Sequence, residues 1–267
     1  ASLRELRRAG MLKPGGRFLG QVKGRDVSLH GEGHCLTVAA QGSGKTTGLI
    51  IPTLITYRGG SVVVTDPKGA ITAQTRRLRQ GAGRVVVLNP WRDELSEDPA
   101  FGVDLGDDGF NPLQLVTLDQ DGRSAAATLA GLVLPDMPGE ESFWRQEARE
   151  LLEWGMLYQA ANEPLERRTL PRLHALLYNP AGLISIMKDM AAANLPADQA
   201  ALQAVASKFY GMIAMGAGSQ FSGVQATATT ALKIYSAGNR LADHVSKPDG
   251  FRLADLKGDM PLTLYLI

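Results

Sequence analysis

Residues 39–46 have the composition and spacing of a phosphate-binding loop. They read Ala-Ala-Gln-Gly-Ser-Gly-Lys-Thr and match the pattern G-x-x-x-x-G-K-[ST] at Gly44, Lys45 and Thr46, with alanine in place of the first glycine. Gly42 and Gly44 let the chain turn so that successive backbone N–H groups point toward phosphate oxygens. Lys45 neutralises charge on the β- and γ-phosphates, and the Thr46 hydroxyl completes a Mg²⁺ shell. The stretch therefore predicts a nucleotide site, with Lys45 as the catalytic residue and Thr46 as the metal ligand.

The elements around the loop predict a parallel sheet. A strand precedes the loop and a helix follows it, and this helix adds the positive end of its dipole to the site. Pro52 lies inside the helix and is expected to distort it. Two further strands, separated by a helix, complete βαβ units, which implies parallel strands with right-handed crossovers. The expected elements are strand Cys35–Ala39, helix Lys45–Tyr57, strand Ser61–Thr65, helix 70–80 and strand Arg84–Leu88.

Asp66 follows the second of these strands and leaves two interpretations open. Open α/β sheets bind ligands at the C-terminal edge of their strands, so the carboxylate is an auxiliary candidate for the phosphate site. The neighbouring Pro67 and Gly69 favour instead a residue that forms the turn. No other strand of the sequence ends in Asp-Glu, so a complete hydrolytic site is not visible.

After about residue 110 the pattern changes to helices without strands. Phe143–Ala161 gives the clearest signal, because its apolar residues recur at helical spacing. The strand-like segment Pro261–Ile267 is expected to return to the sheet. The predicted fold class is therefore α/β with an inserted all-α domain. The expected domains are 1–110, 111–222 and 223–267, and the further helices are 171–178, 181–192, 197–213 and 223–236.

Composition and charge exclude several classes of protein. Hydrophobic residues make up 44% of the 267 residues and charged residues 21%, which is typical of a globular chain, and the net charge of +1 excludes a strongly basic nucleic-acid binder. The single cysteine, Cys35, excludes an internal disulfide and a cysteine-rich zinc module. No run is apolar enough to span a membrane. The basic residues Arg76, Arg77 and Arg79 are expected on a solvated helix face, rather than at a phosphate or a subunit interface.

The ordered motifs resemble those of the type IV secretion coupling proteins of the TraG class, over nearly the whole chain. The phosphate loop alone is common to many families. The run Asp66-Pro67-Lys68-Gly69 at that distance, joined to Asn89-Pro90 after the next strand, is far more specific. The segments that carry the resemblance are 39–46, 51–54, 60–69, 87–90, 110–113, 142–144 and 221–224.

The resemblance implies a RecA-like nucleotide-binding domain with an inserted all-α domain, in a hexameric ATPase on the cytoplasmic face of the bacterial inner membrane. Such proteins use ATP with Mg²⁺ and deliver relaxase–DNA complexes or protein effectors to a type IV secretion channel. The family's phosphate-binding residues correspond to positions 42–47. The full expected nucleotide-binding set is Ala40, Gln41, Gly42, Ser43, Gly44, Lys45, Thr46 and Thr47.

The family's second carboxylates follow a strand after the helical domain, and the chain is expected to end before them. The family's membrane hairpin is also expected outside this chain, so membrane attachment is implied for the parent protein alone. By itself the chain is then expected to bind ATP weakly and to hydrolyse it negligibly. Two other functions stay open: a recruitment receptor built on residues 111–222 with little ATPase activity, and a DNA translocase of the FtsK type, which shares the phosphate loop but not the helical insertion.

Overall fold

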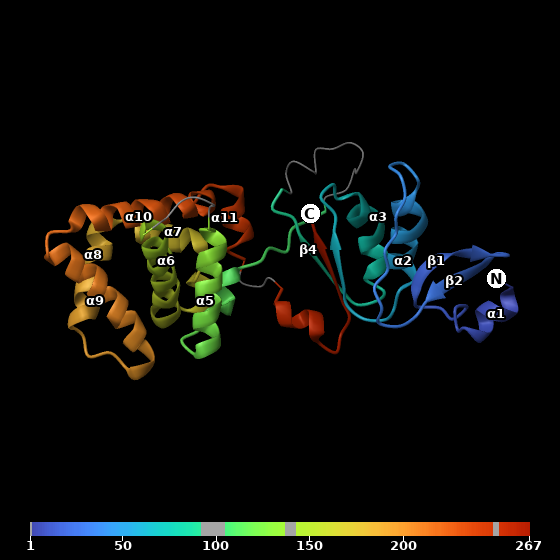
Figure 1. Cartoon of the computed structure of the whole chain (residues 1–267), viewed down its shortest axis with the longest axis horizontal. Helices are drawn as coiled ribbons and strands as arrows, with labels where there is room; N and C mark the ends of the chain where they lie inside the picture. The colour runs from blue at the N-terminus through green and yellow to red at the C-terminus, as the bar shows by residue number, and fades with distance from the viewer. Residues whose placement is uncertain (1, 92–104, 137–142, 248–250) are drawn as a thin grey trace. The chain divides into compact units, whose positions relative to one another are not determined.

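The computed structural model describes residues 2–91, 105–136, 143–247 and 251–267, which belong to two compact units (Figure 1). One unit, here called the sheet unit, consists of Ala1–Asp108 and Phe251–Ile267. The other, here called the helical unit, consists of Gly109–Gly250 and contains only helices and connecting segments among its described residues. The expectation of an α/β chain with a parallel sheet is confirmed.

The sheet unit is built from short elements. A hairpin precedes the phosphate loop, and the parallel strands follow it. In chain order the elements are α1 (Leu3–Arg8), β1 (Arg17–Val22), β2 (Arg25–Leu29), a π-helical turn (Thr46–Ile50), α2 (Ile51–Thr56), β3 (Val62–Thr65), α3 (Ala70–Arg79), β4 (Arg84–Leu88), a 3₁₀ turn (Leu253–Lys257) and β5 (Leu262–Leu266).

Three parallel strands form the sheet, in the order β3-β5-β4. The central strand, β5, therefore comes from the far end of the sequence, as the strand-like pattern of Pro261–Ile267 predicted. The first four of its five residues are buried. Strands pair with β5 on both of its edges, and both of its faces are covered, because Leu262 and Leu264 on one face and Thr263 and Tyr265 on the other are all buried.

One row of side chains crosses the sheet beneath α2 and α3. The strand register aligns Val64 with Tyr265 and Tyr265 with Val87. Leu54 of α2 packs on this buried row, with Ile71 of α3 beside it. Because residues two apart on a strand share a face, the row fixes which side of each strand carries the core of the sheet unit.

The Arg79 side chain is buried between α2, α3 and the sheet and is 1% exposed. Its Nε donates to the Thr263 hydroxyl at 2.9 Å. Its Nη1 donates to the carbonyl oxygens of Leu54, at 3.1 Å, and Tyr57, at 2.7 Å. These carbonyls lie at the C-terminal end of α2, where the helix dipole is negative and favours a cation. Burial lowers the pKa of the Arg79 guanidinium, which remains protonated at neutral pH.

The burial of Arg79 corrects the expectation that all three arginines of α3 face solvent. Arg77 is exposed, as predicted, whereas Arg76 is half-buried and donates to the carbonyl of Leu105 at 2.6 Å. Arg79 lies eight residues after Ile71 and four after Thr75, so helical periodicity places it on the face that meets the sheet. The sequence-based expectation placed Arg79 in solvent because it is charged, and an arginine without a partner is rarely buried.

A β-hairpin precedes the phosphate loop. β1 and β2 pair antiparallel and are joined by Lys23 and Gly24, both with positive φ, which is the two-residue turn that matches strand twist. The backbone N–H of Phe18 in β1 donates to Thr53 Oγ1 of α2 at 3.1 Å. The hairpin is therefore attached to the helix that follows the loop.

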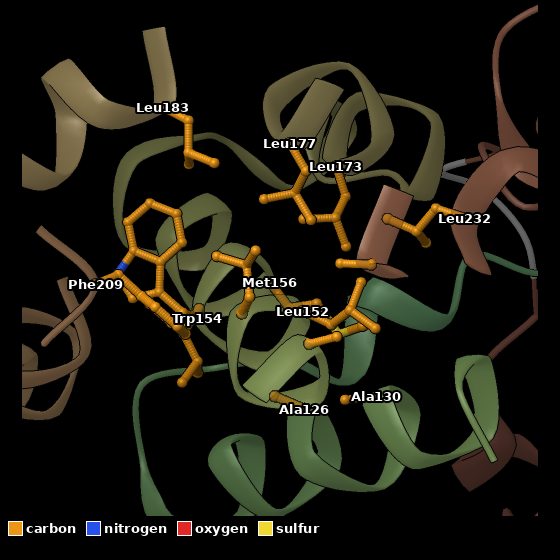
Figure 2. Packing of buried hydrophobic residues seen from close by; sticks show 14 of the residues in the cluster. Ala126, Ala130, Leu152, Trp154, Met156, Leu173, Leu177, Leu183, Phe209 and Leu232 are labelled. Carbon is orange, nitrogen blue, oxygen red and sulfur yellow. The ribbon is translucent and has the colours of Figure 1, made fainter. Parts of the chain in front are cut away.

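The helical unit has its own core around α6. Figure 2 shows Leu173 and Leu177 of α7 pointing toward Leu152 and Met156 of α6, and all four side chains are buried. A Cβ at Gly155 would lie 2.5 Å from Leu173 Cδ1, so α6 and α7 approach closely only because this residue is glycine. The helices are α5 (Gln120–Val133), α6 (Phe143–Asn162), α7 (Leu170–Tyr178), α8 (Pro180–Ala192), α9 (Ala200–Ala214), α10 (Gly218–Leu232) and α11 (Arg240–His244), with 3₁₀ turns at Pro112–Leu115, Leu165–Arg167, Ala197–Gln199 and Lys233–Tyr235.

Two further sequence-based expectations differ from the structure. Residues Cys35–Ala39 do not form a strand; Leu36 is 89% exposed and Val38 84% exposed. An extended segment becomes a strand only when a partner strand pairs with it, and the apolar pattern alone does not supply one. The expected boundary at 222/223 falls inside α10, which packs on α6, so the contacts place residues up to Gly250 in the helical unit.

We predict that Arg79→Met destabilises the sheet unit by about 3 kcal/mol, because two buried carbonyls and one hydroxyl lose their donor. Amide hydrogen exchange measures this as faster exchange in peptides that cover β5 and β3. The matched control is Arg77→Met on the same helix, which should leave exchange unchanged. Equal protection of β5 in both variants would contradict the role given to Arg79.

Candidate nucleotide-binding site

The loop at residues 40–47 owes its shape to two glycines. Gly42 has φ +77° and Gly44 has φ +80°, values that side chains with a Cβ rarely adopt. The N–H of Ser43 donates to the carbonyl of Ala40 at 3.3 Å and closes the turn between them. Lys45 follows Gly44 in the right-handed helical conformation. Alternation of left-handed and right-handed residues directs consecutive N–H groups into one concavity, which is the geometry that binds an anion.

The Lys45 ammonium lies over the start of the loop. Its Nζ donates to the carbonyl oxygens of Ala39, at 2.7 Å, and Ala40, at 2.8 Å. An ammonium has three N–H donors, so one remains for an acceptor outside the described chain. The side chain thus holds a positive charge at the start of the loop. A phosphate bound by the loop backbone would lie near this cation.

The helix after the loop begins with a widened turn. The N–H of Ile51 donates to the carbonyl of Thr46, five residues earlier, and α2 continues from Ile51. Pro52 lacks an N–H, and its ring would crowd the carbonyl four residues before it in a regular helix. The widened turn accommodates this residue. The distortion predicted at Pro52 is confirmed, and it lies directly beside the loop.

The threonine hydroxyls of the loop differ in their hydrogen bonds. Thr47 Oγ1 donates to the Gly44 carbonyl at 3.3 Å. Thr46 is exposed, and its hydroxyl has no hydrogen bond within the described parts of the chain. A free hydroxyl next to the phosphate position fits a Mg²⁺ that arrives with a nucleotide. The described ranges contain no group of three or more His, Cys, Asp or Glu side chains suited to hold a metal.

Asp66 has a structural partner at the start of α3. It is 4% exposed, and its Oδ2 accepts from the Thr72 N–H at 2.7 Å and from the Thr72 hydroxyl at 2.8 Å. Gly69, with φ +67°, donates its N–H to the Asp66 carbonyl at 2.9 Å. The carboxylate therefore satisfies an N–H of the first turn of α3. Within the described residues it makes no hydrogen bond or ion pair with the loop, so the structure does not join Asp66 to the predicted phosphate site.

An apolar slot lies beside the loop segment. It has a volume of about 400 Å³, and it is lined on one side by Cys35 and Thr37 and on the other by all four residues of β3. Phe18 and Leu49 contribute further apolar lining. Among the described strands, β3 pairs with β5 alone, so the second edge of β3 faces this slot with its backbone groups unpaired by any strand.

Sequence reasoning missed the group that fixes the far end of the loop helix. Arg79 binds the last carbonyls of α2, and the loop lies at the other end of the same continuous helical segment. The signal for this contact was the shared helical face of Ile71, Thr75 and Arg79. The hydrogen-bond partners of Arg79 lie far from it in the sequence, so residue spacing within α3 does not predict which groups it binds.

None of the helices in the described ranges is long and apolar enough to cross a bilayer.

Comparison with known proteins shows that the sequence is similar to proteins of conjugative DNA transfer. The protein-family model described as Type IV secretory system Conjugative DNA transfer matches residues 1–267. A conjugal transfer protein TraG from Escherichia coli is 32% identical over 175 residues, which are 62% of this chain and 26% of that TraG. A protein VirD4 from Agrobacterium fabrum is 36% identical over 116 residues, which are 39% of this chain and 17% of VirD4. The match therefore spans about a quarter or less of these relatives.

We predict that Asp66→Ala destabilises α3 by about 1–2 kcal/mol, because the carboxylate caps the first turn of this helix. The same variant should bind nucleotide with an affinity within about threefold of the original. Hydrogen exchange at residues 70–75 and equilibrium binding of Mg·ATP measure the two effects. The neighbouring exposed Lys68→Ala variant is the control for both. Loss of nucleotide binding by a variant with undisturbed α3 would place Asp66 at the phosphates instead.

Proposed function

Because the chain belongs to the type IV secretory system conjugative DNA-transfer family, we propose that the whole protein is an ATP-hydrolysing coupling protein. In this role it delivers relaxase–DNA complexes or protein effectors to a type IV secretion channel. The observation that carries the proposal is the loop itself: two glycines with positive φ and the Lys45 ammonium, which donates to the Ala39 and Ala40 carbonyls at the start of the loop. A strand-to-helix turn without a ligand has no need for this combination.

The loop residues have separate tasks in this proposal. The N–H groups of residues 42–47 bind the phosphate oxygens, and Lys45 orients and neutralises the terminal phosphates. The hydroxyl of Thr46 would hold a Mg²⁺, which when bound supplies charge neutralisation between the phosphates. Ala40 and Gln41 position the turn through the Ala40 carbonyl, which accepts from Ser43. Activation of the attacking water falls to groups outside this set.

The sheet unit is proposed to be part of a RecA-like domain. In such a domain the strand before the phosphate loop lies inside the sheet, whereas Cys35–Ala39 here is extended and exposed. The slot between this segment and the open edge of β3 has apolar walls and the unpaired backbone edge that an added strand requires. We propose that the whole protein fills this slot with a further parallel strand and so brings residues 35–39 into the sheet.

The helical unit favours a coupling protein over a DNA translocase of the FtsK type. It is a compact unit with its own core, inserted between β4 and β5 of the sheet unit. This insertion is the feature that the translocases lack, and it is the proposed receptor for cargo. A hexameric ring on the cytoplasmic face of the inner membrane, with membrane segments supplied by the parent protein, completes the proposal. A receptor with little ATPase activity is the second candidate.

We predict that Lys45→Ala in the whole protein abolishes ATP hydrolysis and cargo transfer together, because the loop loses its only cation. The first effect is measured as steady-state ATP hydrolysis, with and without single-stranded and duplex DNA. The second is measured as transfer of cargo between cells. Lys188→Ala, an exposed lysine of the helical unit, is the matched control. Normal turnover by Lys45→Ala would disprove the ATPase. Transfer without any hydrolysis would favour the receptor.

We also predict that residues 35–39 and β3 are more protected in the whole protein than in residues 1–267 alone. A strand added to the slot would hydrogen-bond the open edge of β3 and cover Leu36 and Val38. Amide exchange on both proteins measures this, with α6 of the helical unit as an internal reference. Identical exchange in the two proteins would exclude the added strand.

A further inference from the structure

The helical unit contains a pocket that the nucleotide site does not use. It has a volume of about 300 Å³ and lies between α5, α6 and α9. Buried Trp154, Leu157 and Leu202 provide apolar lining, and the partly exposed Arg123, Glu150 and Glu153 provide charge. An apolar wall with a few ionisable groups is the usual character of a ligand site.

Glu153 is the unusual group in this pocket. Its side chain is partly buried and has no hydrogen-bond or ion-pair partner among the described residues. Burial raises the pKa of the Glu153 carboxyl, and the nearby charge of Glu150 raises it further. Partial burial without a partner disfavours the charged form of this carboxyl, and a cation bound beside it would offset that effect.

The other charges of the pocket are already engaged. Lys208 Nζ lies 2.5 Å from Glu150 Oε2 and 2.7 Å from Glu147 Oε2. Arg123 Nη1 donates to the carbonyl of Leu118 at 2.9 Å, and no ion pair joins Arg123 to Glu153 within the described residues. Glu153 is therefore the free carboxylate of the pocket and the group able to receive a cation.

The indole of Trp154 is a second observation at the same place. Trp154 is 1% exposed and lines the pocket, and its Nε1 has no acceptor among the described residues. The N–H itself is shielded from the pocket, so the indole contributes the apolar surface of its ring to the pocket wall.

We propose that this pocket binds one cationic side chain, lysine or arginine, of a partner polypeptide. The apolar walls fit the aliphatic stem, and Glu153 pairs with the charged end. Arg123 lines the same pocket and repels any cation there, so a ligand with one positive charge is favoured over a polyamine with several. The proposal goes beyond the ATPase and does not require nucleotide.

The test follows the tryptophan indole signals of the ¹⁵N-labelled chain by NMR. The probe is acetyl-Gly-Leu-Arg-Leu-Gly-amide, and its neutral counterpart carries citrulline in place of arginine. We expect the indole signal of Trp154, assigned with Trp154→Phe, to shift on addition of the arginine peptide, while those of Trp91 and Trp144 stay in place. The citrulline peptide and the diamine putrescine should bind at least tenfold more weakly.

Two variants separate recognition from folding. Glu153→Gln should weaken binding of the arginine peptide at least tenfold, whereas Glu166→Gln, an exposed glutamate of the same unit, should not change it. Glu153→Gln should also unfold at the same or a higher temperature at pH 7, because it removes a charge that folding disfavours. The difference should vanish below the ordinary glutamate pKa, where the carboxyl is protonated in both states.

Three results would overturn the proposal. One is the absence of a shift at Trp154 up to about 10 mM arginine peptide. Another is equal affinity for the citrulline peptide, or unchanged affinity in Glu153→Gln. The third is an affinity for putrescine equal to that for the arginine peptide, which would assign the pocket to a free polyamine. None of these results bears on Lys45, so failure here is distinct from failure of the ATPase proposal.

Discussion

Arg79 joins three elements of the sheet unit through one buried guanidinium. It ties the last carbonyls of α2 to the central strand, and Thr75, one turn earlier on α3, lies 2.6 Å from the Tyr265 hydroxyl on the same strand. The helix after the phosphate loop is thereby anchored at its C-terminal end. Its other end carries an exposed loop with few packing contacts, which is where local motion concentrates. The C-terminal end of this helical segment is therefore fixed by buried contacts, whereas the loop at its other end is exposed.

The sequence predicted features whose determinants are local. The phosphate loop needs contiguous residues, two of them glycines, and the structure confirms the left-handed conformation that these glycines permit. The helices of the helical unit follow from apolar periodicity and from capping side chains that begin α5, α7 and α8, namely Asp119, Thr169 and Asn179. The widened turn before Pro52 also follows from local sterics.

The features that were not predictable depend on partners far along the chain. Cys35–Ala39 has the composition of a strand, but composition does not supply a neighbour to pair with. The burial of Arg79 depends on Thr263 and on the end of α2, and neither is visible from its own helix. The carboxylate of Asp66 left two interpretations open in sequence because its partner, Thr72, lies in the next helix. Whether residues 40–47 bind a nucleotide stays a prediction.

The central position of β5 has a consequence for folding during synthesis on the ribosome. The hydrogen bond from the Leu262 N–H to the Ser61 hydroxyl joins residues 201 positions apart. The strands β3 and β4 are therefore synthesised long before the strand that separates them. The helical unit is contiguous in sequence, so it can fold in the meantime and shorten the loop that the last strand must close. Until β5 has been synthesised, β3 and β4 have apolar sequences and unpaired edges. The late stage of synthesis is therefore the period when this chain is most prone to aggregation and most dependent on chaperones.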